Sequence, residues 1–444
     1  MLAHLALRPA ISSGPDAAWL LGLLLLAVLY MPSCLAGKYA YGEQIVRVGK
    51  SWPDAAPPRI EFANGTADLA PGDGAYWQQL AALEEEGGPY SDGLAEPLVS
   101  LGRYHRHNGD LQQAMLLYRR ALHVVRINDG LYSERQAPIL QAILETYRVS
   151  GDLQALDARY DYYFRLYGNG KPPYTDLRLR ATLAYLRWQR EALRLEIDGQ
   201  EDGRLFDLYQ LNKDVLESVS ADPAVSLASY RELVFSQLRN LYILEDRYAP
   251  TIENMGVAPP LPIISNEWNQ EDFTRRRMET IQRGALSQGV GLLEDLIQRS
   301  GATGETTQLA RAHLELGDWY QWHGKQGRSA EQYRQVVQLL QAENMPGLLE
   351  QWLGQPVELP DNGAFWQPAP APGSEPRAVV TARYEVSRRG RVRNLQTEVT
   401  GGGDARLAAR VKRKLSHIRF RPRWVAGAAE AVTVVQRDYE LINP

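Results

Sequence analysis

The chain has 444 residues, of which 44% are apolar, and this proportion excludes wholesale disorder. A single cysteine excludes a framework of disulfide bonds, so stability must come from apolar surface buried in two or more cores. The formal net charge of −4 hides an asymmetry, because residues 377–444 carry fifteen Lys and Arg against six Asp and Glu. A basic tail on an acidic body suits docking between the two, attraction to an anionic partner, or simply a soluble surface.

An apolar run at residues 17–30 predicts export. Its fourteen residues are fewer than the roughly twenty that cross a membrane, and they suit the core of a signal peptide. Small residues before Gly37 favour cleavage there, so residues 1–36 are predicted to be an export signal. Cys34, the lone cysteine, leaves lipidation open, and an uncleaved anchor is a third alternative. In each case the remainder is predicted to be periplasmic.

Residues 37–94 are expected to form an irregular arm, because they show no strong periodicity. Helical hairpins are predicted at 95–128, 137–170 and 310–343, each with a glycine at its turn. In the first hairpin, small residues sit where two helices approach closely and larger ones fill the spaces between them. These residues are Leu98, Leu101, Gly102, Ala114, Tyr118 and Ala121.

This spacing resembles the tetratricopeptide repeat, a helical hairpin that stacks into a curved scaffold. The second copy departs from the pattern, because Leu156 and Tyr163 are bulky where small residues are expected. The resemblance implies that the first helix of each hairpin lines a concave groove. Side chains of mixed charge on that face suit a peptide or protein segment. These side chains are Arg103, Arg106, Glu145, Arg148, Asp318 and Gln321.

Between these copies the apolar spacing stays helical, so the helical domain is expected over 95–345. Prolines in 257–264 predict a loop that interrupts it. Residues 346–376 lose the periodicity, are rich in Pro and are expected to form a linker. A hydrolase with its site around 188–248 is an alternative, although no cluster of ionisable residues marks it in the sequence.

Residues 377–444 predict a small α+β domain. Apolar and polar residues alternate over 380–387, Gly390 lies at a turn, and 392–399 form a second strand. A helix with a basic outer face follows, and its apolar stripe consists of Leu407, Val411, Leu415 and Ile418. An Arg-Phe-Arg-Pro step at 419–422 and a final strand at 431–441 complete the domain.

This order of elements resembles the C-terminal domain of TonB-like energy transducers, with Gly390, Phe420 and Pro422 as its marks. In that family an edge strand pairs with an extended partner segment, and strand exchange can form dimers. The resemblance implies a partner-binding surface on the last strand, which includes Val435, Arg437 and Tyr439.

Two features differ from true transducers. The membrane segment of a transducer carries a histidine, whereas the apolar run here has none. A transducer also has a long Pro-rich spacer that can cross the periplasm, whereas the linker here is short. Both differences argue against force transmission by this chain alone. A TonB-like component of an outer-membrane energy-transduction or transport system remains the alternative.

No catalytic, cofactor or metal site is expected. His105 and His107 lie two residues apart on a helix and point to different sides. The Gly-x-Ser-x-Gly elbow and the phosphate-binding loop are both absent. We therefore predict a mainly α protein with a small α+β domain, which acts as a scaffold for periplasmic or outer-membrane proteins and not for nucleic acid. Membrane attachment at the N-terminus and homodimer formation stay open.

Overall fold

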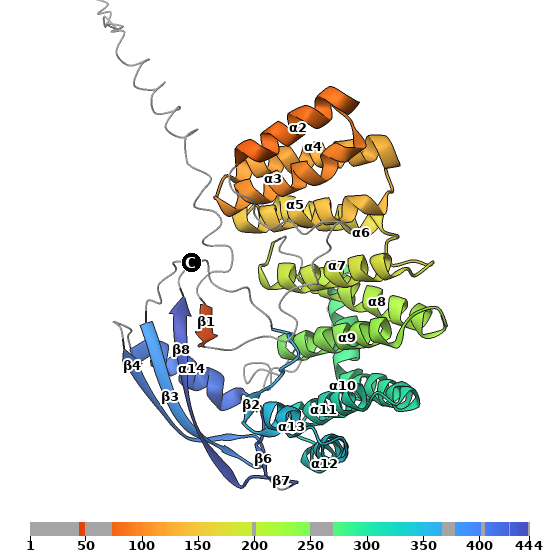
Figure 1. Cartoon of the computed structure of the whole chain (residues 1–444). Helices are drawn as coiled ribbons and strands as arrows, with labels where there is room; N and C mark the ends of the chain where they lie inside the picture. Colours follow the sequence, from red (N-terminus) through yellow and green to blue (C-terminus); the bar gives the residue numbers. More distant parts are fainter. Residues whose placement is uncertain are drawn as a thin grey trace, which may run out of the picture.

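The computed structural model describes residues 44–48, 73–197, 201–248, 270–365, 378–400, 405–425 and 427–442. Helices packed against each other make up most of it, and a small region of strands follows at the C-terminal end (Figure 1). The predicted fold class, mainly α with a small α+β domain, is confirmed. The apolar run at 17–30, Cys34 and the loop at 257–264 lie outside the described residues. Within those residues, no helix is long and apolar enough to cross a membrane.

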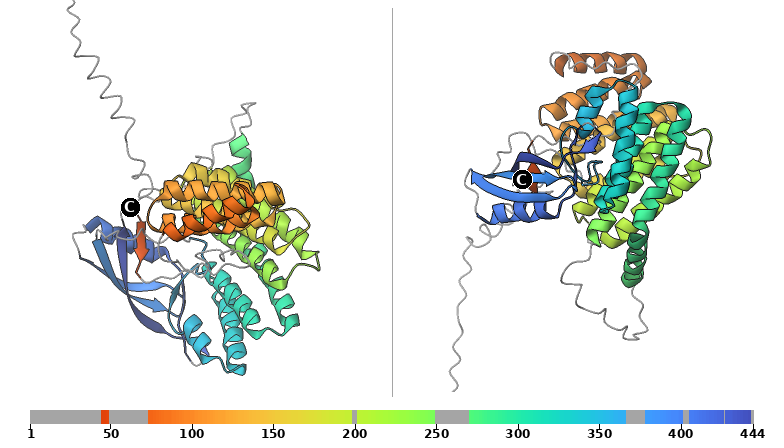
Figure 2. Two further views of the ribbon diagram at one scale, coloured as in Figure 1. Left: turned by 45° about the horizontal axis from the view of Figure 1, so that its top comes forward. Right: turned by 90° about the horizontal axis from the view of Figure 1, so that it is seen from below.

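The helices of the body stack in chain order, so that each one contacts its neighbours in sequence (Figures 1 and 2). The helical structure predicted between the second and third hairpins is confirmed. The elements are α2 (Asp73–Gly87), α3 (Ala95–His107), α4 (Leu111–Asp129), α5 (Ala137–Ser150), α6 (Leu153–Leu166), α7 (Asp176–Arg194), α8 (Glu201–Ser220), α9 (Leu227–Arg247), α10 (Gln270–Thr303), α11 (Thr306–Trp322), α12 (Gln326–Ala342) and α13 (Pro346–Leu353).

The hairpins close where glycine faces a tyrosine ring. A Cβ atom at Gly102 of α3 would lie 2.5 Å from Tyr118 of α4, and one at Gly317 of α11 would lie 2.6 Å from Tyr333 of α12. Both distances are too short for a real contact, so only glycine lets these helices approach. At the next helix start, Asp110 accepts a hydrogen bond from the Gln113 amide at 3.1 Å. The predicted close approach is therefore confirmed, and Asp110 caps the second helix of the first hairpin.

Two expectations about irregular segments are wrong. The supposed arm at 37–94 contains helix α2, whose Leu80 is buried against α3, and a strand, β1 (Gln44–Arg47). The supposed linker at 346–376 begins with helix α13 and strand β2 (Val357–Glu358). Its Leu353, Leu359 and Ala364 are buried. The helix has only eight residues and the strand only two, so each is too short to produce a period that stands out in the sequence.

The C-terminal domain is an antiparallel sheet in the order β1-β8-β3-β4. Its own strands are β3 (Ala378–Ser387), β4 (Val392–Thr400) and β8 (Val432–Ile442), and helix α14 (Ala405–His417) packs on β3 and β4. The predicted stripe of Leu407, Val411 and Leu415 is buried against this sheet together with Phe420. Two short pairs extend towards the helices: β2 with β5 (Phe420–Arg421), and β6 (Trp424–Val425) with β7 (Ala428–Ala429).

Strand β1 joins the sheet from near the other end of the chain. Its residues 44–47 pair with 442–439 of β8, and the Val48 amide donates to the Asp438 carbonyl at 2.9 Å. Because β8 has eleven residues, β1 covers only the end of its edge. Among the described residues, no strand pairs with 432–437 on this side of β8. Half of the β8 edge is therefore without a paired strand among the described residues.

We expect Gly317→Ala to lower the free energy of unfolding by about 1–3 kcal/mol, because the new methyl group would overlap the buried Tyr333 ring. The matched control is Gly291→Ala in α10, where nothing lies within 4 Å of the added Cβ. That change should stabilise the protein by about 0.5–1 kcal/mol through helix propensity. Urea unfolding measures both, and equal effects of the two variants would contradict the packing argument.

Candidate partner-binding surfaces

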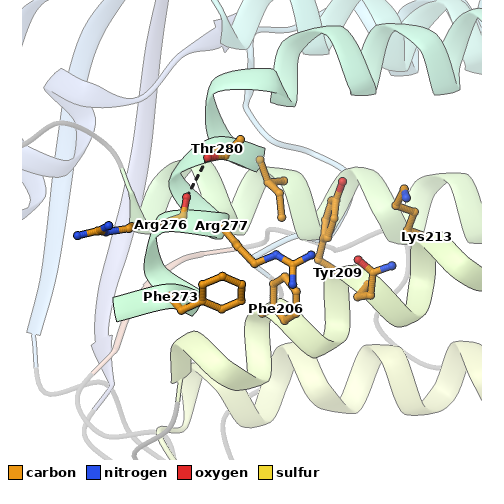
Figure 3. Close-up of a pocket in the computed structure, with 9 residues that line it drawn as sticks. Phe206, Tyr209, Lys213, Phe273, Arg276, Arg277 and Thr280 are labelled. Carbon is orange, nitrogen blue, oxygen red and sulfur yellow. Dashed lines mark hydrogen bonds between the residues drawn. The ribbon is translucent and has the colours of Figure 1, made fainter. Parts of the chain in front are cut away.

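One pocket, of about 500 Å³, opens between α8 and the first turns of α10 (Figure 3). Aromatic rings and cationic side chains line it, among them Phe206, Tyr209, Phe273 and Arg277. None of the residues predicted to bind partners takes part in it. No sequence motif marked this place, because its residues come from two helices 60 positions apart that only the fold brings together.

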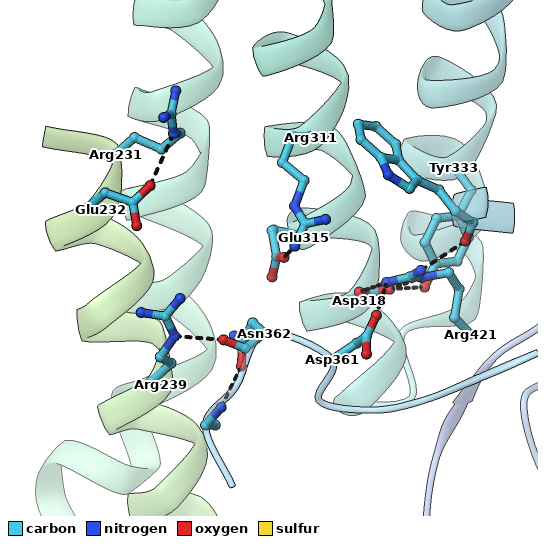
Figure 4. A network of polar contacts seen from close by, with 12 residues as sticks. Arg231, Glu232, Arg239, Arg311, Glu315, Asp318, Tyr333, Asp361, Asn362 and Arg421 are labelled. Atoms are coloured by element: carbon cyan, nitrogen blue, oxygen red, sulfur yellow. Dashed lines mark hydrogen bonds and ion pairs between the residues drawn. The ribbon is translucent and has the colours of Figure 1, made fainter. Parts of the chain in front are cut away.

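The face shared by the first helices α3, α5, α7, α9 and α11, here called the first-helix face, carries the predicted groove residues. Its C-terminal half is filled by the C-terminal domain. Arg421 of β5 enters this face and donates from Nε to Oδ1 of Asp318 at 2.8 Å and from Nη2 to Oδ2 at 2.5 Å (Figure 4). Tyr333 also donates to Asp318, at 2.8 Å. The Arg421 and Asp318 side chains are only 3% and 2% exposed, so this ion pair is shielded from water.

The electrostatics of Arg421 follow from this pairing. Burial by itself lowers the pKa of the guanidinium. The charge and hydrogen bonds of Asp318 raise this pKa by more than burial lowers it, so the net pKa lies above its ordinary value. Asp361 adds a second carboxylate 3.7 Å from Nη2, and Nη1 donates to the Trp352 carbonyl at 2.8 Å. The 352–362 segment thereby completes the site from a third side, and Arg421 stays charged.

A second contact fixes the β3–β4 turn on the same helix. The Gln321 amide donates to the carbonyls of Arg389 and Phe420, at 2.9 and 3.0 Å. Gly390 lies between them with φ +65°, and a Cβ there would be 2.0 Å from the Phe420 carbonyl oxygen. The predicted turn glycine is confirmed, and the close approach gives it a second function in docking the domain.

The expectation that Asp318 and Gln321 face an open groove is therefore wrong. Both lie on the predicted face of α11, but both are buried, at 2% and 3% exposure, beneath this chain's own C-terminal domain. Spacing along a helix identifies a face without saying what covers it. The segment that covers this face includes the Arg-Phe-Arg-Pro step at 419–422, to which Arg421 belongs.

The N-terminal half of the first-helix face remains accessible in part. Arg103 and Arg106 are half-buried on α3, and Arg106 pairs with Glu145 of α5 at 2.5 Å. Arg148 of α5 in turn pairs with Glu191 of α7. The structure thus places three of the predicted residues, Arg106, Glu145 and Arg148, in two ion pairs that join α3 to α5 and α5 to α7. Their use by a partner stays a prediction.

On the last strand, the predicted side chains lie on the covered face of the sheet. Val435 and Tyr439 are 8% and 2% exposed and belong to the core of the C-terminal domain. Arg437 donates to Glu358 of β2 at 2.8 Å, and Tyr439 donates to the same oxygen at 2.8 Å. The expectation that these side chains form an exposed surface is wrong, because side chains at odd positions of β8 point to the covered face. Strand addition uses backbone groups, which lie at the strand edge instead.

The open part of the β8 edge differs in character from these buried positions. Val432 and Val434 are 45% and 60% exposed on the outer face of the sheet, and Gln436 is exposed beside them. The Asp438 carbonyl faces β1, and the register with β3 is continuous from 432 to 441. Backbone groups of the even positions 432, 434 and 436 therefore face outward from the edge. They form a row of donors and acceptors that no described strand pairs with on this side.

Buried charged side chains also gather in the middle of the body, where the hydrolase alternative would place its site. Arg190 donates to Ser236 and Asn240 of α9, at 2.9 Å each, and Glu191 pairs with Arg148. These groups connect one helix to the next. The pocket of Figure 3 is lined by none of them. Among the described residues, no group of three or more His, Cys, Asp or Glu side chains is placed to hold a metal ion.

One acid–histidine pair lies at the end of this middle region. The His323 Nε2 atom is 3.4 Å from Oε2 of Glu245, which also accepts a hydrogen bond from Trp322 at 2.9 Å. The rings of Tyr242 and Trp319 surround the pair. Burial raises the pKa of Glu245 to about 7. Burial, with a smaller contribution from Lys325, lowers the pKa of His323 to about 4.

We expect Asp318→Asn to lower the free energy of unfolding by about 3 kcal/mol, because it leaves the buried Arg421 charge largely uncompensated. The matched control is Glu430→Gln, which removes the half-exposed pair with Arg423 (3.5 Å) and should cost less than about 1 kcal/mol. Urea unfolding compares the two, and limited proteolysis reports release of the C-terminal domain. A loss for Asp318→Asn no larger than the control would contradict the docking role.

The acid–histidine pair predicts opposite pH dependences for two variants. In His323→Gln, the raised pKa of Glu245 contributes stability that is present below about pH 4.5 and lost as the pH rises to about 7. In Glu245→Gln, the lowered pKa of His323 contributes stability that is present above about pH 6.5 and lost as the pH falls to about 4. The two slopes cancel in the unaltered protein. Urea unfolding at pH 4.5, 5.5 and 6.5 tests this, and slopes of the same sign would refute it.

Comparison with known proteins assigns neither family nor function. No protein-family model matches the chain, and no curated protein matches its sequence.

Proposed function

We propose that the protein is an exported adaptor of the bacterial cell envelope that binds an extended segment of another protein by strand addition to β8. One observation carries the proposal: β1 already lies antiparallel on this edge, and no strand of the described part of the chain pairs with residues 432–437 beside it. An edge that accepts one extended segment has the twist and spacing to accept another. The side chains exposed there, Val432 and Val434, favour a partner strand rich in β-branched or apolar residues.

Two family resemblances in the sequence support the same proposal. The hairpin spacing is similar to the tetratricopeptide repeat, whose first helices bind protein segments. The order of elements in residues 377–444 is similar to the C-terminal domain of TonB-like transducers, which pair with partner strands. A second partner would then contact the accessible half of the first-helix face, at Arg103, Arg106, Glu145 and Arg148.

The docking of the two domains favours a passive adaptor over the alternative, a TonB-like component of an energy-transduction or transport system. Arg421 and Gln321 hold the sheet against α11, and β2 pairs with β5. A sheet that is fixed in this way keeps its edge at a constant angle to the helical body. Transmission of force over a distance would need a domain that is free to extend from its body.

The test places a photo-crosslinking residue at Gln436 in the full chain and, as a control, at exposed Lys412 on α14. We expect a discrete adduct with an envelope protein from position 436 alone. Adding Val434→Pro removes a backbone donor that faces the open edge and should abolish the adduct. Val434→Thr keeps that donor and should preserve it. The proposal fails if position 436 gives no specific adduct, or if both substitutions at 434 act alike.

A further inference from the structure

The pocket between α8 and α10 has a chemistry that the proposed adaptor surfaces do not use. Its cations are Lys213, Arg276 and Arg277, and among the described residues that line it none is acidic. This stands out because residues 1–376 carry a net charge of −13, the balance left when the basic C-terminal domain is excluded. A local basic site on an acidic body attracts an anionic ligand.

Arg277 is the pocket side chain whose orientation best suits ligand binding. Its guanidinium carbon lies 5.0 Å from the Phe206 ring centroid and 5.3 Å from that of Phe273, so two rings hold it in place (Figure 3). It makes no hydrogen bond or ion pair with another described residue, and it is exposed. A guanidinium that is oriented by stacking keeps its planar row of N–H donors for a carboxylate. Lys213, in contrast, is already paired with Glu217 at 3.1 Å.

The apolar lining of the pocket indicates which kind of group the ligand carries beside its anionic group. Phe206, Tyr209 and Ile281 form its wall, and Phe273 stays 53% exposed at its border. A volume of about 500 Å³ is large enough for an aromatic side chain and its neighbours. Because exposed residues form the rim, a small molecule would be left largely uncovered, whereas small-molecule sites bury most of their ligand. A surface segment of another protein suits this shape better.

We propose that this pocket binds an acidic peptide segment of a partner protein, in which an aromatic side chain packs on the wall that Phe206, Tyr209 and Ile281 form. A neighbouring carboxylate would then pair with Arg277. Aromatic anchors beside a charged pair are typical of the residues that dominate binding energy at protein interfaces. The site is independent of the β8 edge, since the two surfaces belong to different domains.

The experiment uses fluorescence polarisation with the full-length protein and a fluorescein-labelled peptide, Asp-Glu-Phe-Glu-Asp. We expect a Kd below about 100 µM that weakens with added salt. Two matched peptides test the chemistry: Asn-Gln-Phe-Gln-Asn removes the charges, and Asp-Glu-Ala-Glu-Asp removes the ring. Each should bind at least about tenfold more weakly.

Variants of the protein locate the site. Arg277→Gln and Phe273→Ala change exposed side chains, so the fold should persist, and each should weaken binding of the acidic peptide by about tenfold. The matched control is Arg328→Gln, another exposed arginine stacked on an aromatic ring, Tyr320, at 5.6 Å. It should leave the Kd unchanged, as should Val434→Pro.

Three results would overturn the proposal. The first is that the acidic peptide does not bind, or binds no better than the uncharged one. The second is that Arg277→Gln weakens binding no more than Arg328→Gln does. The third is that vesicles of phosphatidylglycerol bind in an Arg277-dependent way while the peptide does not, which would assign the pocket to a lipid surface. Loss of the crosslink at Gln436 would leave this proposal unaffected, so the two fail separately.

Discussion

The buried ion pair between Arg421 and Asp318 decides how the two domains of this protein are arranged. Removing both charges from water is costly, and such a pair adds little net stability compared with apolar residues of the same size. The ion pair instead fixes the orientation of the two elements that it joins. The guanidinium meets one carboxylate through two hydrogen bonds, so only one orientation of β5 on α11 satisfies it. The position of the whole sheet, and hence of its open edge, depends on that orientation.

The same interaction divides the first-helix face into two parts. Around Asp318 and Gln321 the chain occupies its own groove, and the segment that fills it also covers the end of the helical array. Stacked hairpins expose an apolar surface at their last member, and a capping element must cover it. Here Trp424 packs against Tyr333 and the α12–α13 core. Towards the other end, Arg106 and Glu145 remain at the surface in part, with their charges matched.

Periodic features of the sequence predicted structure well. The alternation over 380–387 and the stripe Leu407, Val411 and Leu415 specify a strand face and a helix face, because each depends only on local geometry. Gly102 predicted a close helix contact for the same reason. What could not be predicted depends on distant partners. Asp318 is an ordinary helix-surface residue until Arg421 reaches it, and Gln44–Arg47 becomes a strand only beside β8. The pocket likewise needs both α8 and α10 in place.

The pairing of β1 with β8 has a consequence for the order of assembly. The helical hairpins join near neighbours in sequence and can form as soon as each pair of helices is present, whereas β1 begins at residue 44 and β8 ends at residue 442. The sheet therefore closes only when almost the entire chain is available, and its high contact order makes that closure slow. During this interval β3 and β4 form a hairpin with unpaired edges, which a holding chaperone would have to protect from aggregation.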